Sequence, residues 1–152
     1  PEDQHFEIGK AINLIEGKDV TIIATGHLVY PSLKAAEELA EKNISAEVIN
    51  LHTIKPLDEE AVLKSVKKTN AVVTAEEHLR NGGMGDSIAQ LLSRKYPLPL
   101  EMVAMNDMFG ESGKPDELLK KYNLDTPDIV SAAEKSVERK KNIFQQSGSS
   151  IS

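Results

Sequence analysis

The chain has 152 residues, enough for one domain with a sizeable core, and 39% of them are hydrophobic, as a folded chain requires. A net charge of −6, with no tryptophan and only 4% aromatic residues, argues against nucleic-acid binding, and the apolar runs are too short to cross a membrane. The absence of cysteine excludes disulfides and thiolate metal sites, and it fits a reducing, cytoplasmic compartment.

Short apolar runs alternate with amphipathic stretches along the chain, a pattern typical of an α/β domain. Five apolar runs predict strands, at residues 11–17, 20–25, 46–51, 71–75 and 100–105. Apolar residues with helical spacing predict a helix over 31–42, and Asp58 predicts the N-cap of a second helix. Pro115, and Thr126 followed by Pro127, predict the starts of two more helices near the carboxyl end.

The links between these elements predict how the strands are arranged. Residues 17–19 are too few for a parallel crossover, so the first strand is expected to lie antiparallel to the second. The other strands are joined by helical stretches, and right-handed crossovers would make them parallel. The prediction is a three-layer α/β/α sandwich around a mixed sheet of about five strands, with the first strand antiparallel.

The chain is predicted to form one domain with short extensions. Pro1 stands where an intact chain would begin with methionine, which suggests an excised or processed fragment. Residues 1–10 are therefore expected to be a linker from a preceding, absent domain, and residues 11–141 to form the domain itself. Residues 142–152 end in small polar residues and are expected to form a flexible tail.

Histidines follow three of the predicted strands, at the edge where open α/β sheets bind ligands. They are His27, His52 and His78, and Glu76 and Glu77 directly precede His78. Imidazole and carboxylate groups can bind zinc or act as acid and base, so a metal or acid–base site is one interpretation. The sequence lacks the His-Glu-x-x-His helix and any i, i+4 histidine pair, which leaves hydrogen bonding at the loop edge, or an interface, as the other.

Three glycines, Gly82, Gly83 and Gly85, stand between the fourth predicted strand and a helical pattern. Free N–H groups at a helix start can cradle a phosphate, so an anion site is one interpretation. The dinucleotide and P-loop fingerprints are absent, and the carboxylates of Glu76 and Glu77 would repel a phosphate. The other interpretation is that the glycines provide positive φ angles and close packing where the chain turns into the helix.

The sequence offers no self-sufficient catalytic set. It contains neither a cysteine nor the G-x-S-x-G elbow that presents a nucleophilic serine. The residues alone indicate an α/β domain with a polar edge that includes His27, His52 and His78. One function that fits such a domain is a free-standing ligand-binding or regulatory module that uses this edge.

Six motifs follow one another along the chain: "IGKA" at 8–11, "TIIATG" at 21–26, "TIKPLD" at 53–58, "TAEEH" at 74–78, "GGMGDSIA" at 82–89 and "FGESGKPDELLKKY" at 109–122. Together and in this order they resemble the carboxy-terminal domain of transketolases. The resemblance covers the chain from residue 6 to about residue 137, and it rests on six motifs in register rather than on any one of them. It implies a five-stranded mixed sheet with one antiparallel strand.

The resemblance also implies a role in an enzyme that transfers a two-carbon ketol unit between sugar phosphates. Transketolases use thiamine diphosphate and a divalent metal, Mg²⁺ or Ca²⁺, held between two other domains of a homodimer. The expected partners are therefore the remaining transketolase domains and a second subunit, with no nucleic acid and no membrane. No cofactor is expected in this chain itself.

The catalytic residues of the family do not carry over to this sequence. The family's metal–diphosphate motif begins Gly-Asp-Gly, which is absent here, and Gly85-Asp86-Ser87 lies in the glycine turn of a different domain. No catalytic, cofactor-binding or metal residue is expected. A docking or anion edge is expected instead, formed by His27, His52, Glu76, Glu77, His78, Gly82, Gly83 and Gly85.

Overall fold

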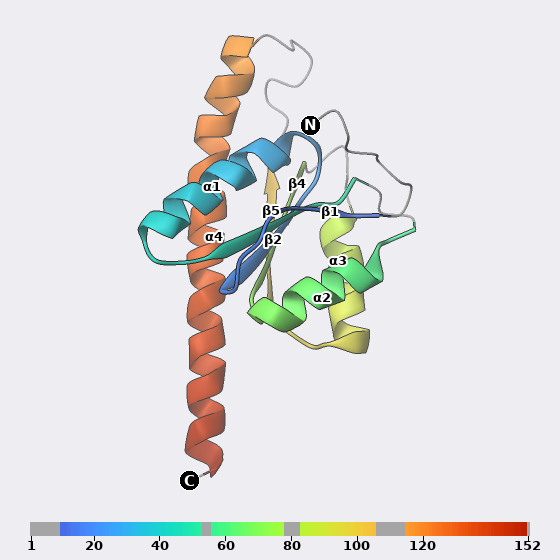
Figure 1. The fold of residues 1–152 in the computed structure, drawn as a ribbon, viewed down its shortest axis with the longest axis vertical. Helices are drawn as coiled ribbons and strands as arrows, with labels where there is room; N and C mark the ends of the chain where they lie inside the picture. Colours follow the sequence, from blue (N-terminus) through green and yellow to red (C-terminus); the bar gives the residue numbers. More distant parts are fainter. Residues whose placement is uncertain (1–9, 53–55, 78–82, 106–114, 152) are drawn as a thin grey trace.

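The computed structural model describes residues 10–52, 56–77, 83–105 and 115–151. Its elements are β1 (Ile12–Ile15), β2 (Val20–Ala24), the short 3₁₀ helix η1 (Gly26–Leu28), α1 (Val29–Glu41), β3 (Ala46–Asn50), α2 (Glu59–Thr69), β4 (Val72–Glu77), α3 (Met84–Lys95), β5 (Leu100–Met105) and α4 (Pro115–Ile151). The strands form a middle layer with helices on both sides (Figure 1). The predicted α/β/α sandwich is confirmed.

The five strands form one mixed sheet in the order β1-β3-β2-β4-β5. Strand β2 pairs in parallel with both β3 and β4, and β4 pairs in parallel with β5. Strand β1 is antiparallel, as predicted, but its partner is β3. The expectation that the first strand pairs with the second was wrong, because β3 is inserted between them.

The short link between β1 and β2 crosses the start of β3, which lies between these two strands. Gly17 crosses the start of β3 so closely that a Cβ atom would lie 2.3 Å from the carbonyl carbon of Ala46. The Asp19 N–H donates to the Ser45 carbonyl at 2.8 Å, and the Asp19 carboxylate accepts from the Ser45 N–H at 2.7 Å. Glycine is therefore required at this crossing, since any side chain would collide with backbone.

Two hydrophobic clusters fix the helix layers on the two faces of the sheet. α1 and α4 share one cluster with the sheet, through Leu39 and Ile129 among others. α2 and α3 share the other, through Val66 and Ile88. Every residue of β2 is buried, because this central strand supplies side chains to both clusters.

Asp58 caps α2, as the sequence predicts. Its Oδ1 accepts a hydrogen bond from the Ala61 N–H at 3.2 Å. Its Oδ2 accepts from the Ala11 N–H at 2.7 Å, which ties the chain just before β1 to the start of α2. One side chain thus caps the start of α2 and anchors the edge strand.

The two helices predicted near the carboxyl end form a single helix. α4 runs from Pro115 to Ile151 with Pro127 inside it, so the predicted N-cap at Thr126 was wrong. An interior proline costs about 3 kcal/mol or more in lost hydrogen bonding and steric conflict. Thr126 and Ile129, on either side of the proline, are both buried, and their packing holds the helix together through it.

Helix α4 continues through the segment that the sequence predicts as a tail. The fraying expected of residues 142–152 concerns motion, so it stays a prediction, as do the domain limits at residues 10 and 141. In the part of the chain that the structure describes, no helix has the length and apolar content needed to cross a bilayer.

Candidate functional site

The two carboxylates of the sequence motif lie inside β4 rather than beyond it. β4 extends to Glu77, two residues past the predicted strand end. Glu76 is 8% exposed and Glu77 is 1% exposed, so neither belongs to an open loop edge. The apolar run ends at Ala75, but pairing with β5 continues through Glu77, opposite Met105. The strand end was predicted at Ala75 because the prediction followed hydrophobicity, and residue type does not reveal where backbone pairing ends.

The Glu76 carboxylate occupies the amino-terminal end of α3. Its Oε2 accepts a hydrogen bond from the Met84 N–H at 3.1 Å, and its Oε1 accepts from the Gly85 N–H at 3.0 Å. The first N–H groups of a helix lack partners within the helix, and the helix dipole favours a negative charge there. Glu76 therefore satisfies two buried backbone donors and joins β4 to α3.

The glycines around this contact serve the backbone in two different ways. Gly83 is the N-cap of α3 and has φ of 118°, a conformation that other residues rarely adopt. At Gly85, a Cβ atom would lie 2.8 Å from the Met102 sulfur and 3.2 Å from the Glu76 carboxylate. A side chain at either position would therefore strain or displace the Glu76 contact.

The structure describes two of the three histidines of the predicted edge. His27 is half-buried in η1, which lies against β4, whereas His52 is exposed after β3 on the other side of β2. His78 and Gly82 lie outside the described residues. The structure thus brings Glu76, Gly83 and Gly85 together around the start of α3, and His52 belongs to a separate stretch of the edge. The docking role of this edge stays a prediction.

The start of α3 does not fit a phosphate or a diphosphate. The two N–H groups that would hold such an anion already bond to the Glu76 carboxylate. Within residues 10–52, 56–77, 83–105 and 115–151, no group of three metal-ligating side chains gathers at one place. We therefore derive no chemical step through thiamine diphosphate or its metal at this site.

A second buried carboxylate, Glu47, lies at the opposite end of the sheet and was not singled out from the sequence. It is 1% exposed, forms an ion pair with Lys68, and accepts from the Gly17 N–H at 3.1 Å. Burial alone would raise the pKa of Glu47, but hydrogen bonds from Lys68, Ser65 and Gly17, together with the charge of Lys68, outweigh burial and lower the pKa below 4.5. This carboxylate holds the glycine crossing in place.

Lys140 fastens α4 to the same end of the sheet. Its ammonium group donates to the Asp19 carbonyl at 2.7 Å and to the Thr69 carbonyl at 2.9 Å. Burial lowers the pKa of Lys140 below 10.5, the charge of Asp19 opposes this shift, and the charge of Lys141 adds to it. The contact links α4, the end of α2 and the start of β2, so it is structural.

Most of the chain matches the model of one protein family, described as "Transketolase, C-terminal domain", over residues 9–129. A 6-deoxy-6-sulfo-D-fructose transketolase subunit from Clostridium sp. (strain MSTE9) is 52% identical over 139 residues, which are 91% of this chain and 43% of that protein. A putative transketolase C-terminal section from Methanocaldococcus jannaschii is 47% identical over 130 residues, or 85% of this chain and 40% of the relative. The chain thus spans less than half the length of these relatives.

Solved structures show the same relationship. A structure described as "Split gene transketolase, inactive beta4 tetramer" superposes with a TM-score of 0.77 at 44% identity, covering 91% of this chain and 45% of that one. A transketolase from Pichia stipitis, in complex with sedoheptulose 7-phosphate, superposes with a TM-score of 0.58 at 20% identity over 88% of this chain and 19% of its own, a likeness of fold alone. The chain belongs to the family of transketolase C-terminal domains.

Proposed function

We propose that this chain is the carboxy-terminal domain of a thiamine diphosphate-dependent enzyme that transfers a two-carbon ketol unit between sugar phosphates. The domain supports contacts with the remaining domains and with a second subunit, and it has no activity alone. Thiamine diphosphate and Mg²⁺ or Ca²⁺ are held by those other domains, in the cytoplasm. The proposal rests on membership of the family together with the use of Glu76 as a structural group.

The Glu76 contact supports a role in shape rather than in chemistry. A general acid or base must exchange a proton with a substrate, and a phosphate cradle must offer free N–H groups. Glu76 instead holds the Met84 and Gly85 N–H groups, in a buried position between β4 and α3. What this edge offers other domains is a fixed backbone shape.

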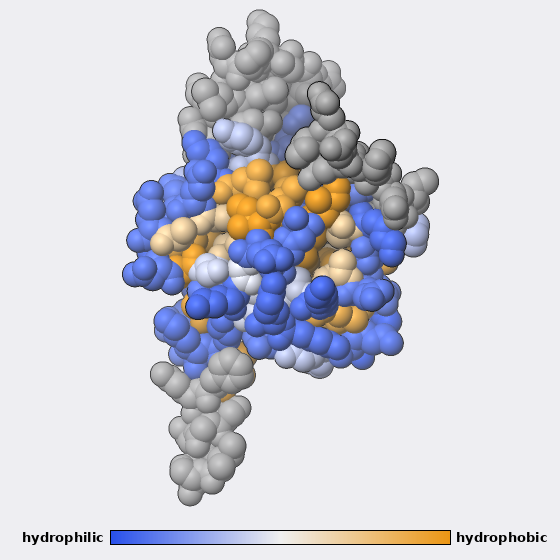
Figure 2. Space-filling model, viewed as in Figure 1, coloured by the Kyte–Doolittle hydropathy of each residue, from blue (hydrophilic) through white to orange (hydrophobic). Residues whose placement is uncertain are grey.

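The surface around β1 and the start of α1 supports docking of further domains. Figure 2 shows apolar surface gathered in this region of the molecule, in orange. Val29 and Leu33 are hydrophobic side chains that remain partly exposed at the start of α1, and Tyr30 is exposed beside them. A contiguous exposed apolar area of this kind is typical of an interaction surface.

The names of the relatives support a division of the enzyme over two chains. The Clostridium relative is called a transketolase subunit, and so is a 38% identical apulose-4-phosphate transketolase protein from Phocaeicola vulgatus. The split-gene structure is described as an inactive tetramer. We infer that this chain likewise acts with a separate chain that carries other transketolase domains.

Ketol transfer between sugar phosphates is the direct test. The 152-residue chain, supplied with thiamine diphosphate and Mg²⁺, is expected to give no turnover. Turnover is expected when the remaining domains are supplied together with this chain, and no turnover when they are supplied without it. Turnover by the isolated chain would contradict the proposal.

The rival function, a free-standing ligand-binding module, makes a different prediction in calorimetry. Titration of Zn²⁺ and of inorganic phosphate into the chain is expected to show no saturable binding. Micromolar binding that disappears when His27, His52 and His78 are all changed to alanine would favour the rival. The matched control keeps these histidines and changes Lys64, on the exposed side of α2, to alanine.

A further inference from the structure

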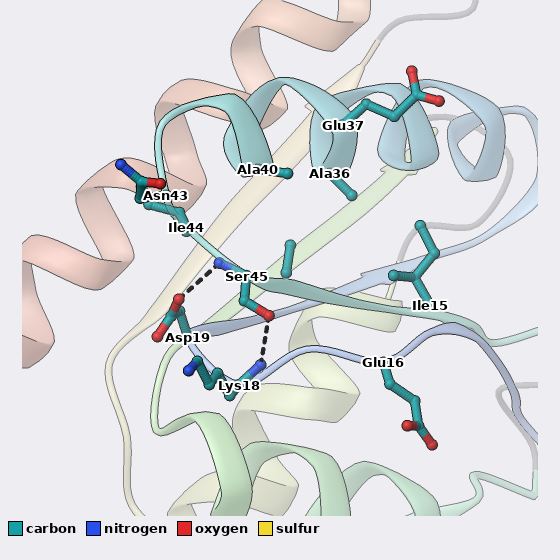
Figure 3. A pocket seen from close by; sticks show the side chains of 11 residues that line it. Ile15, Glu16, Lys18, Asp19, Ala36, Glu37, Ala40, Asn43, Ile44 and Ser45 are labelled. Atoms are coloured by element: carbon teal, nitrogen blue, oxygen red, sulfur yellow. Dashed lines mark hydrogen bonds between the residues drawn. The ribbon is translucent and has the colours of Figure 1, made fainter.

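A hollow lies at the end of the sheet opposite the glycine turn, between α1 and the end of β1. Its volume is about 470 Å³, and the β1–β2 link and the start of β3 close its lower side. In Figure 3, Ile15 and Ala36 point into the hollow from opposite sides, and Ala40 lines the same helix face. Ile44 completes an apolar floor that the chain itself leaves partly uncovered. We call this feature the α1–β1 groove.

The rim of the α1–β1 groove is acidic. Glu16, Asp19 and Glu37 contribute three carboxylates, against the single ammonium group of Lys18. The Asp19 carboxylate is engaged with the Ser45 N–H, and Glu37 is exposed on α1. The Glu16 side chain is exposed but points away from the hollow (Figure 3). A segment that fits this groove therefore needs apolar side chains flanked by positive charge.

The carboxyl end of α4 has this composition. Residues 139–152, "RKKNIFQQSGSSIS", contain three basic residues and no acidic residue, in a chain whose net charge is −6. Arg139 pairs with Glu101 and Lys140 donates to two backbone carbonyls, so Lys141 is the basic residue that the argument uses. Lys141 is exposed, and Ile143 is 42% exposed, one of three large hydrophobic residues exposed in the described part of the chain. Basic and apolar side chains therefore stand next to each other at this end of the helix.

The same end of α4 extends past the body of the domain. α4 has 37 residues, which at 1.5 Å per residue make a helix of about 55 Å, whereas a six-residue strand spans about 20 Å. Figure 1 shows the helix reaching beyond the sheet and the other helices at its carboxyl end. Among the residues up to 143, for which burial is described, Val137 is the last buried one in α4, Lys140 is half-buried, and Lys141 to Ile143 are exposed.

We propose that the α1–β1 groove binds the carboxyl end of α4 from a second copy of this chain. Ile143 of the second copy lies on the apolar floor, and Lys141 lies against Glu37 at the rim. If the exchange is mutual about a two-fold axis, the two contacts close a symmetric dimer and leave no open end. This contact does not depend on the proposed role as a supporting domain of a transketolase, because it lies at the opposite end of the sheet from the glycine turn.

Sedimentation equilibrium of the 152-residue chain over a range of concentrations tests the proposal. A monomer–dimer equilibrium is expected, and raising the salt concentration should weaken it because the rim contacts are ionic and exposed. Removal of residues 142–152 is expected to raise the dissociation constant of the dimer at least tenfold. A chain that stays monomeric at every concentration, or a dimer that survives the truncation unchanged, would overturn the proposal.

Exchanging the charges of a contacting pair distinguishes the loss of this contact from a general loss of folding. Glu37→Lys and Lys141→Glu are each expected to weaken the dimer severalfold, and the double variant should recover most of the affinity because the pair is restored with its signs reversed. Lys64→Glu, an equal change of charge on α2, is the matched control and should leave the dimer unchanged. Weakening by Lys64→Glu as large as by Lys141→Glu, or no recovery in the double variant, would count against the contact.

Discussion

At the scale of single residues, the Glu76 contact decides between the two interpretations of the glycine turn. From the sequence, the turn could be a cradle for a foreign anion or a piece of backbone geometry. The structure supplies the anion from the chain itself, eight residues before the first donor. The residue types in the motif were visible in the sequence, but the pairing of Glu76 with Met84 and Gly85 depends on β4 and α3 lying side by side.

Replacing Glu76 tests this contact. Glu76→Ala leaves two buried N–H groups without acceptors, so we expect the free energy of unfolding to fall by about 2 kcal/mol, and Glu76→Gln, which keeps one acceptor oxygen, to cost less. Urea denaturation measures both. Asp86→Ala, at an exposed position in the first turn of α3, is the control and should change stability little. Equal losses for Glu76→Ala and Asp86→Ala would refute the buried contact.

The structure predicts different losses of stability when a methyl group is added at Gly17 and at Gly85. At Gly17 an added methyl group would meet the backbone of Ala46, which cannot yield, whereas at Gly85 it would first meet the end of the Met102 side chain, which can. We expect Gly17→Ala to cost about 3 kcal/mol or more and Gly85→Ala about 1 kcal/mol in thermal or urea unfolding. The reverse order of these two losses would contradict the crossing of β3 by the β1–β2 link.

Glu47 makes the free energy of unfolding depend on pH in the acidic range. Because its pKa is lower in the folded state than the ordinary 4.5, its contribution is complete above pH 4.5 and is lost as the pH falls through the folded-state pKa. Glu47→Gln removes this titration. The free energy of unfolding of the variant, measured by urea denaturation at several pH values, should therefore fall less steeply below pH 4.5 than that of the unchanged chain. Parallel curves would rule out the lowered pKa.

At the level of elements, most of the fold could be predicted from periodicity and caps. All five strands and the Asp58 cap were found, because short apolar runs and a side-chain acceptor are local features. The partner of β1 could not be found, since the sequence within residues 17–19 does not reveal that β3 passes between β1 and β2. The continuity of α4 through Pro127 was also hidden, because packing on the sheet outweighs the local signal for a helix start.

Lys140 tests how α4 is held as an element. Lys140→Met keeps the aliphatic stem but leaves the Asp19 and Thr69 carbonyls without their donor, so we expect a loss of about 1 kcal/mol in the free energy of unfolding. Lys64→Met, at an exposed position of α2, is the matched control and should have little effect. If both variants unfold at the same denaturant concentration as the unchanged chain, the Lys140 contact carries no stability.

At the scale of the whole molecule, the two ends of the sheet have different roles. The carboxyl ends of the parallel strands meet at the glycine turn, where Glu76 fixes a surface that we propose for docking other domains. The opposite end holds Glu47, Lys140 and the α1–β1 groove, which we propose for contact between copies. Among the described residues, neither end gathers three metal-ligating side chains. We propose that the chemistry belongs to other domains.

Calorimetric titration of thiamine diphosphate, in the presence of Mg²⁺, into the 152-residue chain tests this central claim most directly. No saturable heat is expected, because Glu76 holds the N–H groups at the start of α3 and, as proposed, other domains hold the cofactor. Saturable binding with one thiamine diphosphate per chain would contradict it.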